Sequence, residues 1–234
     1  MLPTIKRFIK SKSKVPDDTI LSIPDQIESW RTANQKMVWG IQEAEFHRIG
    51  TPPQLTDQDR RDGFVGVILS YGFGQDGHGN ADAVLSGKLA WEYVRKHRKI
   101  KTWQCGDIHF DRSDHFRLRP EAPSRPKGYY FSKIQTGERY QNLKVSQLLR
   151  KLDDDTCCGP EGLQLLTITH THFTDRMNDR KMPFMAFADY DVAPHGFNDF
   201  CDALQMFCSQ SILGLGIGNV DLNYPFFGIP TIRF

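Results

Sequence analysis

The chain has 234 residues, of which 39% are hydrophobic and 25% are charged, as in an ordinary globular protein rather than a disordered or membrane chain. Its formal net charge of +2 gives no reason to expect a nucleic-acid partner. No apolar run approaches the roughly 18 residues that span a bilayer, and the five cysteines show neither a disulfide framework nor zinc-ligand spacing. We therefore expect a cytoplasmic monomer or homodimer with reduced thiols and no transmembrane segment.

Residues 1–52 are predicted to form a basic tail and a helical cap packed on the core. Residues 1–14 carry five basic side chains and no acid, which favours a solvated tail over an organelle-targeting or anionic-surface helix. Apolar residues then recur at helical spacing through residues 17–49, with an interruption near Pro24. Residues 53–234 are expected to form the main part of a single globular unit.

The main part is predicted to alternate strands with helices. Strands are expected at residues 64–69, 101–105, 129–131, 163–169 and 184–188, and helices at about 82–97, 138–152 and 197–209. Such alternation favours a mostly parallel sheet that is covered by helices on both faces. The predicted fold class is therefore α/β, a Rossmann-like three-layer αβα arrangement with an N-terminal helical segment.

A glycine-rich turn joins the first predicted strand to its helix. Gly72, Gly74 and Gly77 spell G-x-G-x-x-G, in the context where backbone amides and a helix N-terminus meet a phosphate or carboxylate. A standard NAD site is not expected. Such a site has an acidic residue at the end of the second strand, about 20 residues after the glycine turn, and the first such residue here, Asp107, lies clearly further along the chain. A turn that serves local geometry alone is the alternative. The predicted ligand-binding residues of this turn are Gly72, Phe73, Gly74, Gln75, Asp76, Gly77 and Asn80.

Three motifs follow one another between residues 64 and 177. The first is this turn, with Asp76-Gly77, and the start of its helix, where Lys88 replaces a usual arginine. The second is residues 137–146, similar to an NTxEN…S helix start, and the third is residues 165–176, similar to a strand that ends in VTSxxHxxRA. In this order the motifs resemble the YdcF/SanA-like family, whose members are Rossmann-like domains of largely undefined activity.

The resemblance implies a ligand pocket at the carboxyl ends of parallel strands, where open α/β sheets also place their ligands on physical grounds. Asp107 or Asn142 would fix hydroxyl groups there, and His172 with Arg176 would hold an anionic group or move a proton. The predicted catalytic residues are therefore His172, Arg176 and Asp107, and Asn142 and His170 join the ligand-binding set. The expected ligand is nucleotide-like or otherwise anionic, for example S-adenosylmethionine or a sugar nucleotide. No metal is expected, and whether catalysis follows stays open.

Two other classes of function compete with this one. A metal-dependent phosphoesterase would use Asp107 and His109, which spell an opening D-x-H, together with the pair His170 and His172. The middle of that pattern is missing, because no histidine lies between His115 and His170. A noncatalytic interaction module is the third class. Residues 189–191 follow the last predicted strand and are a further candidate for a pocket rim.

Overall fold

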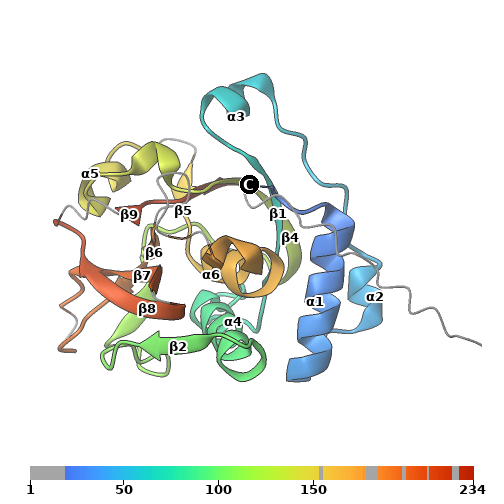
Figure 1. Ribbon diagram of the computed structural model, residues 1–234, viewed down its shortest axis with the longest axis horizontal. Coiled ribbons are helices and arrows are strands. Elements are labelled where there is room, and N and C mark those ends of the chain that lie inside the picture. Colours follow the sequence, from blue (N-terminus) through green and yellow to red (C-terminus); the bar gives the residue numbers. More distant parts are fainter. Residues whose placement is uncertain are drawn as a thin grey trace, which may run out of the picture.

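The computed structural model describes residues 19–152, 155–175, 177, 184–196, 199–209, 211–222 and 227–234. Two β-sheets and the helices around them make up the fold (Figure 1). The helices are α1 (Ile23–Met37), α2 (Glu43–Phe46), α3 (Asp57–Arg61), α4 (Ala83–His97), α5 (Val145–Leu149) and α6 (Pro160–Gln164). None of these described helices is both long enough and apolar enough to cross a membrane.

Sheet A has the strand order β1-β4-β10-β5, with every pair of neighbours antiparallel. Its strands are β1 (Gly66–Gly72), β4 (Gly128–Gln135), β10 (Thr231–Arg233) and β5 (Thr156–Cys157). The outer edge of β1 bonds to side chains, since Gln26 of α1 and Gln164 of α6 each bond to both an N–H and a C=O of this strand. These amides replace the neighbouring strand that an edge lacks.

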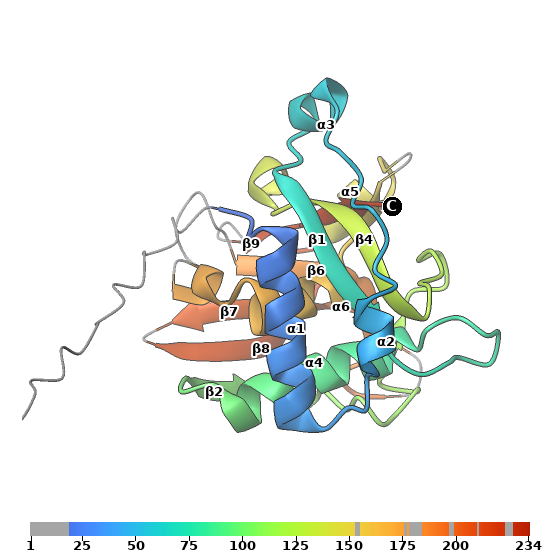
Figure 2. The same ribbon diagram turned by 90° about the vertical axis from the view of Figure 1, so that its right-hand side faces the viewer.

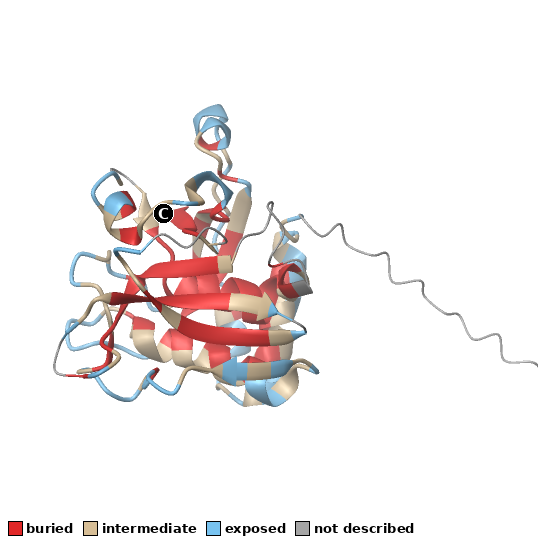
Figure 3. Ribbon diagram, turned by 60° about the vertical axis from the view of Figure 1, so that its left-hand side comes forward, coloured by how far each residue is buried: buried red, intermediate tan, exposed pale blue. Residues whose placement is uncertain are grey.

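Sheet B has the strand order β2-β8-β7-β6-β3, and β9 pairs with β6. Its strands are β2 (Lys101–Gln104), β8 (Ile212–Asn219), β7 (Asp202–Ser209), β6 (Phe184–Val192), β3 (Phe116–Leu118) and β9 (Phe227–Gly228). Only the β2–β8 and β6–β9 pairs are parallel among these strands. In Figure 3 the strands of this sheet lie in front of the helices.

Helix α1 contributes to the main core instead of resting on its surface. Figure 2 shows it beside β1, and its Trp30 side chain is completely buried, with Nε1 donating a hydrogen bond to the carbonyl oxygen of Leu69 at 3.0 Å. The same hydrophobic cluster contains residues of α4, β6, β7 and β8. The part of the predicted helical cap that the structure describes is therefore built into the core.

The predicted parallel Rossmann sheet is wrong, because both observed sheets are mostly antiparallel. The predicted strand at residues 163–169 is helical: it is the end of α6 and a π-helical turn, Leu165–Thr169. This apolar run is buried throughout, and a buried run has no periodicity that separates strand from helix. The predicted helix at residues 197–209 contains β7, a central strand whose burial on both faces removes the alternation.

Candidate functional site

A cavity of about 670 Å³ lies where the two sheets approach each other. Its walls come from β5 and β6, from α5 and from residues 119–123 (Figure 1). Leu149, Leu152 and Phe234 make part of the lining apolar, while Arg119 and Asp189 supply charge. We refer to it as the α5–β6 cavity. Glu121, Arg150 and Asp155 add further charge, so the lining mixes apolar and charged groups.

Behind this cavity lies a buried ion cluster of Arg125, Glu161 and Asp189. The Arg125 side chain is 1% exposed, and its Nε atom lies 2.9 Å from Oε1 of Glu161. Its Nη2 atom lies 2.5 Å from Oδ2 of Asp189. Tyr130 donates its hydroxyl hydrogen to Glu161, and Thr156 donates to Asp189. One guanidinium is thus shared by two carboxyl groups that are far apart in the sequence.

The two carboxyl groups differ in acidity although they share this guanidinium. Burial opposes the charge of both. For Glu161 the attraction of Arg125 and the hydrogen bond from Tyr130 prevail, and they lower its pKa. For Asp189 burial prevails over Arg125, and it raises the pKa to about 6. Asp189 also lines the α5–β6 cavity, so it is the member of the pair that can exchange a proton near neutral pH.

Arg119 lines the same cavity and has one donor without a partner among the described residues. Its Nε atom donates to the carbonyl oxygen of Ala188, and its Nη1 atom lies 2.7 Å from Oδ1 of Asp191. Its Nη2 atom is buried and has no hydrogen-bond partner within the part of the chain that the structure describes. A buried donor without a partner costs free energy unless a ligand or water accepts from it. A guanidinium with one unpaired donor among the described residues therefore lies beside Asp189 in the cavity wall.

The raised pKa of Asp189 predicts how stability depends on pH. The pKa is about 6 in the folded protein and about 3.9 in an unfolded chain, so the folded state holds this proton more tightly. Ionisation of Asp189 should therefore reduce stability as pH rises from about 4 to above 6. The free energy of unfolding of the original chain, minus that of Asp189→Asn, should fall by about 2–4 kcal/mol across this range. Urea denaturation at a series of pH values measures this difference.

Asp114 provides the control for this measurement. Its pKa is lowered, mainly by a hydrogen bond from Arg112, and its side chain is 44% exposed. The corresponding difference for Asp114→Asn should therefore be small and should change in the opposite direction with pH. A difference for Asp189→Asn that does not vary with pH would contradict the raised pKa.

The glycine-rich turn is exposed and is closed by its own side chains. Residues 74–79 are exposed, and the Asp76 carboxylate accepts hydrogen bonds from the backbone N–H groups of His78 and Asn80. These bonds lower the pKa of Asp76, that of His78 having the largest effect. At the N-terminus of α4, Asp82 accepts from the N–H of Leu85. Carboxylates therefore occupy the positions expected for a bound anion, and the predicted ligand site in this turn gains no support from the geometry.

The two ends of the turn are packed against the rest of the protein. Phe73 is buried and contacts the rings of Trp30 and Trp39. A Cβ atom at Gly72 would lie 2.1 Å from the carbonyl oxygen of Pro126, so this glycine is needed for close packing. Gly74 has a φ of +64°. Gln75 and Gly77 are exposed. These residues have a clear structural role, and their role in binding stays a prediction.

The other predicted site residues lie on several different elements. His170 is fully buried, and its Nε2 atom accepts from the N–H of Leu21 at 2.9 Å. Burial, with a smaller effect of His172, lowers the pKa of His170 to about 3, so it stays neutral. His172 lies 3.2 Å from the carbonyl oxygen of Thr19. Asp107 and Asn142 are exposed on separate loops, and Arg176 lies outside the described residues.

The phosphoesterase alternative requires a cluster of metal ligands. His109 contacts His115 and not the pair His170 and His172, which contact each other. Across the described residues no three His, Cys, Asp or Glu side chains are placed so that they could hold a metal ion. The geometry therefore does not favour this alternative.

The sequence analysis identified Asp189 only as part of a possible rim and did not identify Arg119, Arg125 or Glu161. A usable signal was present. Glu161 stands in Gly-Pro-Glu-Gly ahead of an apolar run, and Arg125 stands between two prolines in a loop too long to be a simple connection. A charged residue in such an apolar setting is rarely buried without a partner.

The likeness to the YdcF/SanA-like family stays a prediction, since the Rossmann-like sheet that it implies is not the observed one. Comparison of the chain with protein-family models, with curated proteins and with solved structures finds no match in any of the three.

Proposed function

We propose that this protein binds an anionic small molecule in the α5–β6 cavity and exchanges a proton with it through Asp189. One observation carries the proposal. Asp189, with a pKa of about 6, lines the same cavity as Arg119, whose Nη2 atom has no hydrogen-bond partner among the described residues. Strongly shifted pKa values in a cavity are a mark of functional sites.

The proposed roles divide between neighbouring groups. Arg119 would hold the anion, because its positive charge and its remaining Nη2 donor favour a charge-assisted hydrogen bond to an oxygen of a carboxylate or phosphate. Asp189 would accept a proton from the bound molecule when ionised and would return it when protonated. Arg125 and Thr156 bond to Asp189 and fix its orientation. Arg125 is itself fixed by Glu161 and by the carbonyl oxygen of Pro123.

Replacement of Arg119 tests the binding role. For Arg119→Met we expect a loss of about 2–5 kcal/mol of binding free energy, the usual cost of removing one member of a desolvated charge pair. The affinity would then fall about thirtyfold or more. The measurement is calorimetric titration of the full chain with inorganic phosphate and with succinate. Arg31→Met is the matched control, because Arg31 pairs with Glu43 at the surface, away from this cavity.

Two further variants separate binding from proton transfer and from folding. Asp189→Asn should keep anion binding while losing the proton uptake or release that accompanies binding in buffers of different ionisation enthalpy near pH 6. Arg119→Lys keeps the charge without the planar fork and should bind more weakly than the original chain. Unchanged affinity in Arg119→Met, with intact circular dichroism, would refute the proposed site. No binding of either probe by the original chain would favour the noncatalytic interaction module.

A further inference from the structure

A strip of aromatic rings crosses the outer face of sheet B. Trp103 of β2 lies 5.8 Å from Phe207 of β7 between ring centroids, Phe207 lies 5.9 Å from Phe184 of β6, and Phe184 lies 5.2 Å from Phe227 of β9. Trp103 is 49% exposed, whereas the three phenylalanines are partly buried. Trp103 is therefore the ring of this strip that presents the most free surface to solvent.

The rings of Trp103 and Phe207 lie close to the backbone of β8, because this strand carries glycines on the same face. A Cβ atom at Gly214 would lie 2.2 Å from Cζ of Phe207, and one at Gly216 would lie 3.7 Å from Cζ3 of Trp103. The rings therefore rest directly on the strand backbone. Helix α5 covers a different part of the sheet, where its Leu148 belongs to the same hydrophobic cluster as Ala186 and Ala203. The Trp103 end of the face stays open, and Figure 3 shows the edge strand β2 as exposed or intermediate.

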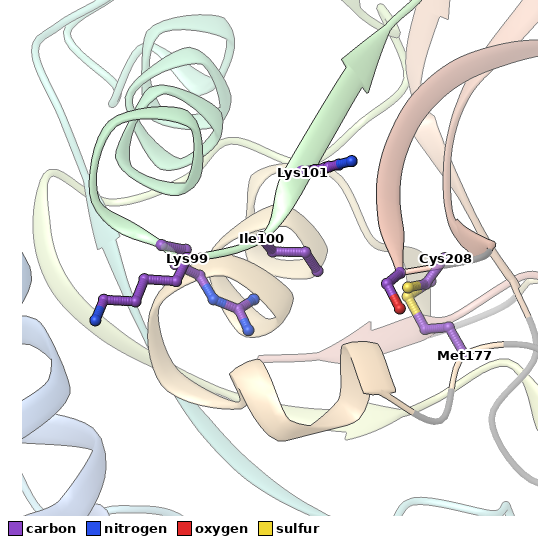
Figure 4. Close-up of a pocket in the computed structure, with 7 residues that line it drawn as sticks. Lys99, Ile100, Lys101, Met177 and Cys208 are labelled. Atoms are coloured by element: carbon purple, nitrogen blue, oxygen red, sulfur yellow. The ribbon is translucent and has the colours of Figure 1, made fainter.

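A cavity of about 720 Å³, here the β2 cavity, lies at the start of the same edge strand. Its described lining contains Arg98, Lys99 and Lys101 and no acidic residue. Figure 4 shows Lys99 and Lys101 leaving the chain in different directions around Ile100, with Met177 and Cys208 across the cavity from them. Neither lysine has an ion-pair partner within the described ranges. This charge is complementary to an anion.

Lys101 belongs to both features. It lines the β2 cavity, and it lies two residues before Trp103 on the same strand, so both side chains leave the same face of the sheet. Their Cα atoms are about 7 Å apart at the usual rise of a strand. The Trp103 ring thus offers a planar stacking surface, and the Lys101 ammonium group provides a cation close to it. Arg98 is engaged elsewhere, donating to the carbonyl oxygen of Thr171, so Lys101 is the cation best placed beside the ring.

We propose that this end of sheet B binds a free nucleoside phosphate, with the base stacked on Trp103 and the phosphate group beside Lys101 at the mouth of the β2 cavity. A base offers the flat π-face that an exposed tryptophan stacks on, and the negative charge of the phosphate matches the positive charge of Lys99 and Lys101. The site is separate from the α5–β6 cavity and does not depend on the function proposed there.

The test is quenching of tryptophan fluorescence by ATP, measured on the full chain at low salt. Trp103 is the appropriate reporter, since Trp30 and Trp91 are at most 1% exposed and Trp39 is partly buried. For Trp103→Ala, followed by calorimetry because the reporter is lost, we expect the affinity for ATP to fall about tenfold or more. Trp103→Phe keeps a stacking ring and should therefore retain most of the affinity for ATP.

Further probes and variants identify the contribution of each group. Lys101→Ala should weaken binding of ATP but leave the weak binding of adenosine unchanged, while Lys127→Ala, an exposed lysine in another loop, should change neither. Arg119→Met should leave ATP binding intact, which separates this site from the α5–β6 cavity. Unchanged affinity of a folded Trp103→Ala variant would overturn the proposal. So would binding of a single-stranded oligonucleotide by a chain that does not bind ATP.

Discussion

The Arg125→Met variant is expected to have a free energy of unfolding about 3–5 kcal/mol lower than that of the original chain. Arg125 is the counter-charge of both Glu161 and Asp189, and all three side chains are at most 3% exposed. Removal of the guanidinium leaves two carboxyl groups in an apolar interior, where an unpaired charge is expensive. Urea denaturation at pH 7, followed by circular dichroism, gives the free energy.

A combined variant shows whether stranded charge is the cause. When Glu161→Gln and Asp189→Asn accompany Arg125→Met, the chain should recover part of the lost stability, because uncharged amides replace the buried carboxylates. Arg31→Met breaks a surface pair whose side chains are 34% and 61% exposed, and it should cost about 0–1 kcal/mol. A triple variant less stable than Arg125→Met alone would argue against this explanation.

The Trp30→Ala variant is the second change with a large expected effect, a loss of about 3–5 kcal/mol. Trp30 is completely buried, and its ring contacts those of Trp39, Tyr71, Phe73 and Tyr129. The substitution would leave a large cavity, and it would remove the donor that serves the Leu69 carbonyl group at the edge of sheet A. Urea denaturation followed by circular dichroism measures the loss of unfolding free energy.

Two controls separate packing from hydrogen bonding. Trp30→Phe keeps much of the ring volume but loses the N–H donor, so it should cost less than Trp30→Ala. Leu222 is 56% exposed, and Leu222→Ala should change stability by about 0.5 kcal/mol or less. A loss below about 1 kcal/mol for Trp30→Ala would mean that α1 contributes little to the stability of the core, contrary to its observed packing.

Local elements with a clear sequence pattern were predicted well. The helix predicted at residues 82–97 is α4, and the strand predicted at residues 64–69 overlaps β1. Strands β2, β4 and β6 also lie at the predicted positions. In each case the pattern depends on neighbours in the sequence, which is the information that a single chain provides.

The sheet topology and the site depended on distant partners. Strand β1 pairs with β4 across the α4 and β2 region, and no residue of β1 shows by itself that this partner is antiparallel. Glu161 and Asp189 likewise meet Arg125 across sequence separations of 36 and 64 residues. The apolar setting of Glu161 indicates that it needs a partner, but no local pattern in the sequence shows that this partner is Arg125.

The position of β10 within sheet A has a consequence for how the protein folds. Residues 231–233 form the strand that bridges β4 and β5, which lie far earlier in the chain. Sheet A therefore cannot close until residues 231–233 find two partners that precede them in the chain, and such distant pairings slow folding. During that interval β4 exposes an unsatisfied edge on which another chain can align. Association with another chain through this edge of β4 is thus prevented only once residues 231–233 have paired with it.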